Sequence, residues 1–113
     1  MTDRSEAAVF QLILHGGNAR GEAYEALDAA EDFNFDEAQK HIDAAEQEFL
    51  QGHKWQTETI RSASEGHTPS FLMVHAQDHV MTAQAELNLI KRIITNYKLI
   101  ERLEKRVEVL ENK

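Results

Sequence analysis

Only six of the 113 residues are glycine or proline, roughly 5% of the chain where average usage gives about 12%. Sandwiches and barrels of β-strands need turn residues about every 8–12 positions, and this chain has far too few of them. Long helices joined by short connections need much less punctuation. The sequence therefore predicts an all-α fold.

Two short breaks interrupt an otherwise helical pattern. In the first, Asn34 suits the N-cap position, and Glu37 follows three residues later in the capping-box position. In the second, Gly66 suits the C′ position that ends a helix, and Thr68 and Pro69 suit the N-cap and first position of the next one. Two breaks leave three helical segments.

The helices are expected at about residues 5–30, 35–64 and 69–111, within a single domain that covers residues 1–113. Short connections make consecutive helices antiparallel neighbours. The prediction is an antiparallel three-helix bundle with a long C-terminal helix. At roughly 1.5 Å per residue, that helix is about 60 Å long and extends past its two companions.

Charge and cysteine content exclude several functional classes. Twelve Lys and Arg against twenty Asp and Glu give a net charge of −8, so the chain is a poor ligand for nucleic acid phosphates. The absence of cysteine excludes disulfides and thiolate-bound zinc, and it fits a reducing compartment. No apolar run exceeds four residues, and the first residues lack the apolar stretch of a secretory signal. We expect a cytoplasmic protein without membrane insertion.

Small residues form a stripe along the first helix. Gly16 begins it, and alanines follow at alternating steps of three and four residues, at Ala19, Ala23, Ala26 and Ala30. Such a stripe allows another helix to approach closely, and a simple bend at the two adjacent glycines is the alternative.

The core stripe of the second helix becomes polar in its middle. After four apolar positions it continues with His53 and Gln56 before it returns to Ile60. Buried polar side chains need partners, so these two residues either satisfy one another's neighbours or line a site. The stripe by itself leaves both interpretations open.

The third helix carries a heptad pattern of apolar residues. Its members are Leu89, Ile93, Asn96, Ile100, Leu103, Val107 and Leu110. The pattern predicts a seam between helices, and its β-branched residues at the a positions with leucine at most d positions favour a parallel dimer. The same frame continues toward the N-terminus through Glu86, Thr82, His79 and His75, so the seam begins with polar residues.

Offsets of three, four and seven residues place His75, Asp78, His79 and Thr82 on one face near the start of this helix. One interpretation is a zinc or iron site, because histidines four residues apart can chelate a metal. The other is a phosphoryl carrier, in which His75 is the nucleophile and His79, Thr82 or Gln77 donates to the phosphate. In that case Asp78 would repel the phosphate unless a cation neutralises it or the helix holds it away.

The second helix is expected to reach the same zone. Folding the chain about the loop near His67 sets Gln56 roughly opposite Asp78 and His53 opposite Met81. His53, Gln56 and Thr82 are therefore candidate substrate-binding residues.

These residues also carry a family resemblance. The run at residues 72–82, Leu-Met-Val-His-Ala-Gln-Asp-His-Val-Met-Thr, resembles the phosphohistidine motif of the enzyme IIA components of the lactose/cellobiose (N,N′-diacetylchitobiose) class of the bacterial sugar phosphotransferase system. Further matches are the runs Gly-Asn-Ala-Arg at 17–20, Glu-Ala-Leu-Asp-Ala-Ala at 25–30 and His-Lys-Trp-Gln-Thr at 53–57. The resemblance covers about residues 8–98.

The resemblance implies a homotrimer of three-helix bundles. It implies that the phosphoryl group comes from the histidine phosphocarrier protein and goes to a cysteine of a IIB component, while the membrane component, IIC, binds the sugar. His75 would be the phosphorylated residue, with Gln77 and His79 orienting it or contacting the phosphate. Asp78 would lie at the trimer axis, where three copies share one Mg²⁺, while His75 faces a cleft between protomers.

The chain departs from this pattern in two places. The third helix continues its heptads through residues 101–113, beyond the length usual in the family, and Asn18 stands where aspartate is expected. Two rival functions remain. One is a non-enzymatic assembly module that acts through the long third helix. The other is a histidine phosphotransfer domain of two-component signalling, which the residues after His75 do not match. The sugar is not readable from these residues.

Overall fold

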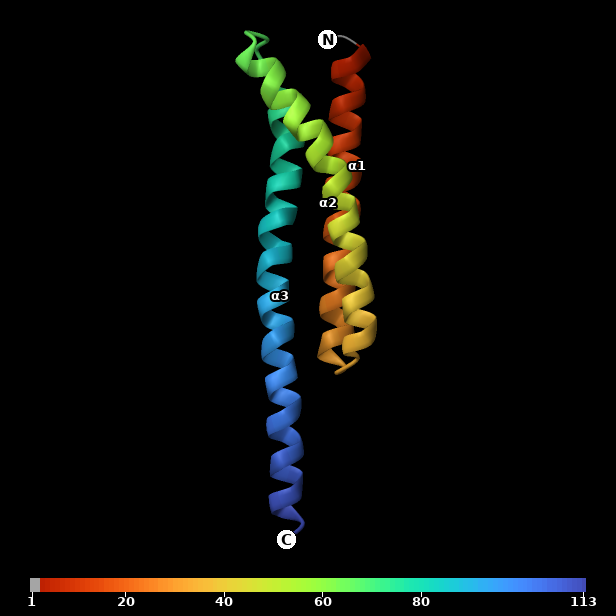
Figure 1. Ribbon diagram of the computed structural model, residues 1–113, viewed down its shortest axis with the longest axis vertical. Coiled ribbons are helices and arrows are strands. Elements are labelled where there is room, and N and C mark those ends of the chain that lie inside the picture. The colour runs from red at the N-terminus through yellow and green to blue at the C-terminus, as the bar shows by residue number, and fades with distance from the viewer. Residues whose placement is uncertain (1–2) are drawn as a thin grey trace.

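The computed structural model describes residues 3–113, with side chains from residue 5 onward, and this part of the chain forms three helices and no strand (Figure 1). The helices are α1 (Asp3–Glu31), α2 (Phe35–Ser64) and α3 (Phe71–Glu111). The all-α prediction is confirmed, and each helix begins and ends within two residues of the expected position. None of these three helices is long and apolar enough to cross a membrane.

The expected signals at the first break and at the end of α2 are both present. Asn34 caps α2, and its side-chain oxygen accepts a hydrogen bond from the backbone N–H of Glu37 at 3.4 Å. Gly66 has φ +98° after the last turn of α2, and its N–H donates to the carbonyl of Ala63. This left-handed conformation suits glycine, and it turns the chain out of the helix.

The expected start of α3 at Thr68 and Pro69 is wrong. Ser70 is the N-cap, and its hydroxyl oxygen accepts a hydrogen bond from the N–H of Met73 at 3.1 Å. Serine is a strong N-cap residue in its own right, and here its extended backbone fixes the first helical residue at Phe71.

Helix α1 lies between the other two helices. It packs along both α2 and α3, whereas α2 and α3 contact one another much less. Figure 1 shows α2 diverging from α1 in its second half, where it crosses toward the beginning of α3. The molecule is 70 Å long, because α3 runs far past the end of the α1–α2 pair. The bundle therefore leaves one side of α3 without a partner.

Alanine dominates the core. Half of the buried apolar residues described are alanines, and the largest fully buried side chains are Leu12, Val80 and Leu87. The predicted small-residue stripe of α1 is fully buried. At Gly16, an added Cβ would lie 3.3 Å from the carbonyl carbon of His79 and from the nitrogen of Val80. Close helix packing is therefore confirmed at Gly16.

The predicted seam of α3 does not pack inside the chain. The face that packs against α1 and α2 is a different one, formed by Met73, Ala76, Val80, Ala83, Leu87, Ile90 and Ile94. The expected seam lies about a quarter to a third of a turn away and is exposed, as Leu89 at 61% illustrates. Both partner helices lie on one side of α3, so the protomer has nothing left to cover the second stripe.

Candidate functional site

Two histidines pair on the exposed surface of α3. His75 and His79 lie one turn apart, and their Nε2 atoms are 3.1 Å from one another. The rings meet edge to face with centroids 4.7 Å apart. One Nε2 must donate a proton to the lone pair of the other. The pair therefore holds one imidazole in a defined orientation at the surface.

Helix α1 packs against the backbone of α3 at the position of this pair. Gly16 lies against the backbone of His79 and Val80, where any side chain would push the two helices apart. On the same side, the Arg20 Nε donates to Glu86 at 2.8 Å and connects α1 to α3. The hydrogen bond with Glu86 raises the pKa of Arg20 above its ordinary value, so this cation is permanent. The close contact at Gly16 and the ion pair of Arg20 with Glu86 together set the position of α3 along α1.

Of the other predicted residues of α3, Thr82 shares the face of the histidine pair, whereas Asp78 and Gln77 are rotated away from it. Asp78 and Thr82 are exposed, and neither has a hydrogen bond or ion pair within the described part of the chain. Gln77 is half-buried and lies about 160° around the helix from His75. In a single chain, therefore, Gln77 does not share the surface on which the histidine pair lies.

His53 and Gln56 lie together, as expected, but away from the histidine pair. They line a small cleft of about 240 Å³ with Val80, Met81 and Gln84 of α3. The predicted placement of His53 opposite Met81 is confirmed. Asp78 is absent from this lining, and so are His75 and His79. The cleft lies on the α2 side of α3, whereas the histidine pair lies on the α1 side.

His15 connects α1 to α2, a structural role that the sequence pattern did not indicate. The Nδ1 of His15 is 2.6 Å from a carboxylate oxygen of Glu48, and its Nε2 is 2.9 Å from the side-chain oxygen of Gln11. Gly52 of α2 faces the same imidazole-bearing residue, and a Cβ there would lie 3.6 Å from the Cβ of His15. The one sequence signal for this contact was Gly52, a small residue in α2 that leaves room for His15.

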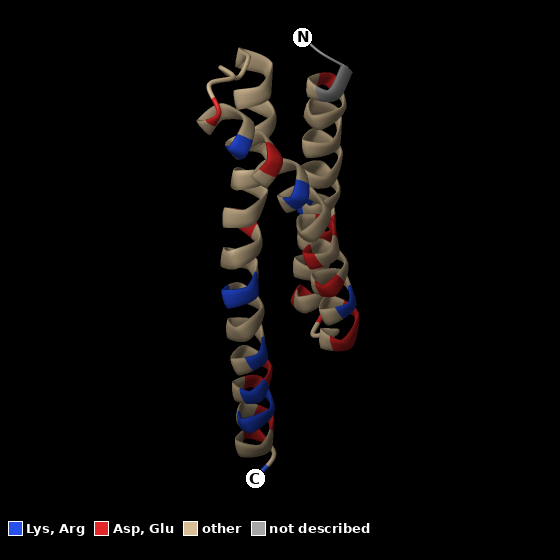
Figure 2. Ribbon diagram, turned by 45° about the horizontal axis from the view of Figure 1, so that its top comes forward, with Lys and Arg blue, Asp and Glu red and all other residues tan. Residues whose placement is uncertain are grey.

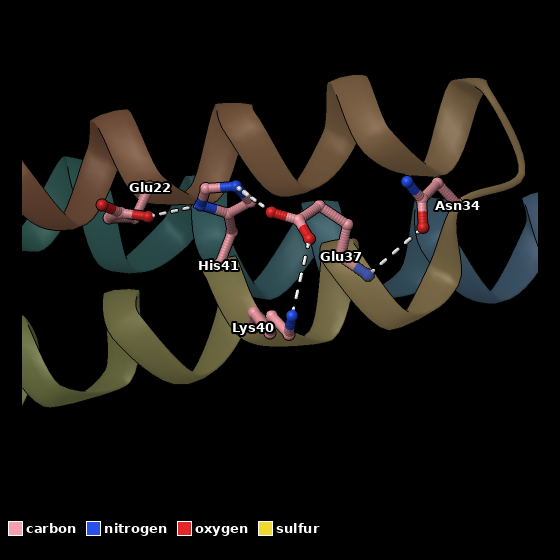
Figure 3. Close-up of polar contacts among 5 residues, drawn as sticks. All are labelled: Glu22, Asn34, Glu37, Lys40 and His41. Atoms are coloured by element: carbon pink, nitrogen blue, oxygen red, sulfur yellow. Dashed lines mark hydrogen bonds and ion pairs between the residues drawn. The ribbon is translucent and has the colours of Figure 1, made fainter.

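Further along the α1–α2 pair, His41 joins a group of acidic residues (Figure 3). Its Nδ1 lies 2.6 Å from a carboxylate oxygen of Glu22, and its Nε2 lies 3.5 Å from Glu37. The hydrogen bond with Glu22 raises the pKa of His41 above its ordinary value, because the carboxylate favours the charged imidazolium. Glu22 lies six residues beyond Gly16, so this group is about 9 Å further along α1 than the contact with His79, and it joins α1 to α2.

The residues that the structure describes form no metal-chelating site within a single chain. Among the residues described, no three His, Asp or Glu side chains are grouped so that they could hold an ion. Asp78 precedes His79 directly, but its carboxylate forms no hydrogen bond or ion pair with either imidazole.

An oriented, accessible histidine on the longest helix of a small bundle is the arrangement that a helical phosphoryl carrier needs. Residues 7–98 match the family model described as the lactose/cellobiose-specific IIA subunit of the phosphotransferase system. The chain belongs to this family.

Relatives of this family resemble the chain over most of its length. It is 40% identical to the lichenan-specific phosphotransferase enzyme IIA component of Bacillus subtilis (strain 168), over 88% of this chain and 93% of that protein. The crystal structure of the cellobiose-specific enzyme IIA from Bacillus anthracis superposes with a TM-score of 0.84 at 39% identity, covering 90% and 94% of the two chains. The IIA(chitobiose) protein of Escherichia coli, solved in complex with HPr, gives 0.78 at 32% identity, covering 88% and 99%.

Proposed function

We propose that His75 is the residue through which this chain, as a IIA component of a sugar phosphotransferase system, carries the phosphoryl group. The observation that carries the proposal is the exposed imidazole of His75, held by His79 at 3.1 Å within the motif at residues 72–82. The donor is HPr, the histidine phosphocarrier protein, by analogy with the IIA(chitobiose) relative solved with it. The acceptor is a cysteine of a IIB component, which serves a membrane IIC component, and the exchange takes place in the cytoplasm.

The chemistry needs one ring nitrogen with an available lone pair. The His75 nitrogen attacks the phosphorus of the phosphohistidine on HPr, and a new N–P bond forms as the donor's N–P bond breaks. The released electron pair returns to the donor imidazole. In the second step the IIB thiolate attacks, the S–P bond forms, and the electron pair of the broken N–P bond returns to His75. Each transfer depends on positioning and on stabilisation of the equatorial oxygens.

His79 orients the nucleophile. When the N–H of His79 donates to the His75 Nε2, His75 keeps its own proton on Nδ1 and is held in one orientation. As the donor phosphate approaches, this N–H turns to a phosphoryl oxygen, and the Nε2 lone pair that it releases attacks the phosphorus. Once His75 is phosphorylated, the same N–H is placed to donate to a phosphoryl oxygen, and Thr82, one turn further along this face, offers a second donor.

We also propose that the chain works as a homotrimer around the exposed face of α3. Asp78 lies about five turns above Asn96, and Ala85, Leu89 and Leu103 lie within about 20° of the same line. From Leu89 toward the N-terminus, this line departs from the heptad pattern by one additional step of four residues. Such an insertion locally unwinds a supercoil. The unpartnered apolar stripe of α3 thus points the same way as Asp78.

A threefold axis along this line explains why the predicted residues lie on two sides of α3. Relative to Asp78, His75 and His79 are rotated about 60° and 100° toward α1, whereas Met81 and Gln77 are rotated about 60° and 100° toward α2. Rotation about the axis brings the α1 side of one copy against the α2 side of the next. Gln77, and with it the cleft of His53 and Gln56, then faces His75 of the neighbouring copy.

The Asp78 carboxylates suit a shared Mg²⁺. Each is exposed and has no partner in the part of the chain described, and carboxylate oxygen is the ligand that Mg²⁺ and Ca²⁺ prefer. Three such groups would meet at the axis, one from each copy, and the ion would neutralise their mutual repulsion. The rotation of about 60° keeps Asp78 off the phosphate on His75.

The test is phosphoryl uptake from the phosphoenolpyruvate-dependent cascade. Wild-type protein takes up one acid-labile phosphoryl group per chain from HPr, and His75→Ala takes up none. His67→Ala is the matched control, because His67 is another exposed histidine, in the loop before α3, and it retains full uptake. Uptake by His75→Ala equal to that of the wild type overturns the assignment.

A further inference from the structure

The last part of α3 is an amphipathic helix that extends past both α1 and α2. The family match ends at residue 98, while α3 continues as a helix to Glu111. We call residues 99–113 the stem. Except for Val109, its apolar side chains lie on one stripe, and all of them are about half exposed or more, from 45% at Leu99 to 65% at Leu110. Ile100, Leu103 and Val107 lie between them on the same stripe.

We propose that the stem pairs with the stems of the other copies as a parallel, in-register coiled coil. This inference rests on the homotrimer proposed above and extends its axis beyond the three-helix part. Ile100 and Val107 occupy the a positions, and Leu103 and Leu110 occupy the d positions, so each copy contributes to four core layers.

The charges beside the stripe specify the direction of pairing. The e positions hold Glu104 and Glu111, and the g positions hold Arg106 and Lys113. In a parallel coil, a g residue faces the e residue five positions later on the next helix, so Arg106 meets Glu111 of the neighbouring copy. An antiparallel coil places g beside g and e beside e, which sets like charges together. The sequence of the stem thus favours copies of itself in parallel.

These flanking charges form no ion pair among the residues that the structure describes. Arg106 and Glu111 are five residues apart, which places them about 140° apart around the helix, and neither has an opposite charge three or four residues away. Neither forms an ion pair with any residue the structure describes. The outward face differs, because Lys105 pairs with Glu101 at 3.6 Å. Figure 2 shows both signs of charge mixed along this end of α3.

A cysteine scan tests the pairing in the full chain, which contains no cysteine of its own. Leu110→Cys places a thiol at a d position, where neighbouring chains come within disulfide reach. Lys105→Cys is the matched control at the outward f position. Under mild oxidation, Leu110→Cys is expected to form interchain disulfides at least about tenfold faster than Lys105→Cys. Equal rates for the two variants overturn the proposal, and Leu103→Cys repeats the comparison at the other d position.

Charge exchange tests orientation and register. In the Leu110→Cys protein, Arg106→Glu or Glu111→Arg alone is expected to slow cross-linking, and the two together are expected to restore it. Failure of the double exchange to restore the rate overturns the parallel register.

Light scattering on the same samples separates this inference from the trimer. A trimer without Leu110→Cys cross-links refutes the stem alone, and a monomer refutes the stem and the trimer together. Uptake of phosphate by His75 is measured independently of both.

Discussion

Gly16 is the residue on which the position of the histidine pair depends most. It has no side chain at the point where α1 meets the backbone of His79 and Val80, and 3.3 Å is closer than a methyl group normally approaches. Helix backbone cannot move aside as a flexible side chain does. The small residue thus fixes the separation of α1 and α3 just beneath the site.

Gly16→Ala is expected to destabilise the protein. Overpacking costs about 1–3 kcal/mol, and the better helix propensity of alanine recovers only about 1 kcal/mol. Gly21→Ala is the control, since a Cβ there meets nothing within 4 Å, and it should raise the melting temperature. Thermal denaturation of the two variants checks this. Equal stabilisation by both would show that α3 moves freely away from α1.

His41 gives the protein a pH-dependent contribution to stability. The carboxylate of Glu22 raises the pKa of His41 above its unfolded value of about 6.5, so the folded state binds its proton more tightly. The stabilisation is complete below about pH 6.5 and is lost as pH rises through the folded pKa. Besides Glu22, the carboxylates of Glu37 and Glu25 act on this imidazole.

The melting temperature of His41→Gln should therefore fall below that of the wild type at acidic pH and approach it at alkaline pH. His67→Gln is the control, because His67 lies exposed in the loop before α3 and has no ion pair among the residues described. A deficit of His41→Gln that stays constant across this range would mean that the proton on His41 does not stabilise the fold.

At the scale of the helices, α3 carries two apolar stripes, one buried and one exposed. One packs against α1 and α2, and the other is the stripe that continues into the stem. Leu87 and Leu89 are only two residues apart, yet Leu87 is 1% exposed and Leu89 is 61% exposed. Substitutions at these two leucines therefore test folding and the proposed assembly separately.

Leu87→Ala should lower the free energy of unfolding by about 2–5 kcal/mol at every protein concentration, because it opens a cavity in the core. Leu89→Ala should leave the folded protomer intact and weaken the trimer, so its effect grows as the protein is diluted. Denaturant unfolding over a range of concentrations measures both. A loss for Leu89→Ala that does not vary with concentration would contradict the assembly role of this stripe.

The helices and two of their ends were predictable because their signals are local. The scarcity of glycine and proline favours helix at each position. The Asn34 cap and Gly66 act within one turn of the helix ends that they determine. The packing of α3 was not predictable in the same way. Periodicity shows which residues share a face, but two faces of α3 repeat at heptad spacing, and nothing local says which one meets α1. Ser70 displaced the expected cap because two good N-cap residues, Thr68 and Ser70, lie within three positions.

The candidate site was predictable in its members and not in its geometry. The motif at residues 72–82 identifies His75 and His79, and their contact follows from helical spacing. His53 and Gln56 were expected in the same zone, and they lie in a cleft on the other side of α3. The spacing of residues in a sequence does not distinguish a contact within one protomer from a contact between copies. The proposed threefold axis would place His53 and Gln56 of one copy beside the histidine pair of the next.

At the scale of the whole molecule, an alanine-rich core and a net charge of −8 both fit a protein that completes its burial by assembly. Small core side chains bury little apolar area in each protomer, while the larger ones on the outer stripe of α3 stay exposed. Part of the negative charge, that of Asp78, lies on the line of this stripe. Assembly would bring three such charges together.

Asp78→Leu should raise the melting temperature of the trimer and remove its dependence on added Mg²⁺. Three carboxylates near one axis repel by several kcal/mol in partly buried surroundings, and leucine replaces this repulsion with apolar contact. Glu108→Leu is the control, since it removes the same charge from the outward face of the stem. A lower melting temperature for Asp78→Leu together with a monomer in solution would exclude an axial position.

The most direct measurement is the site of phosphorylation in the intact wild-type protein. After incubation with phosphoenolpyruvate and the cascade up to HPr, peptide mapping at neutral pH should find the phosphoryl group on His75. Adding the IIB component should then remove it. A phosphoryl group on His79 or on any other residue, with His75 unmodified, would contradict the mechanism.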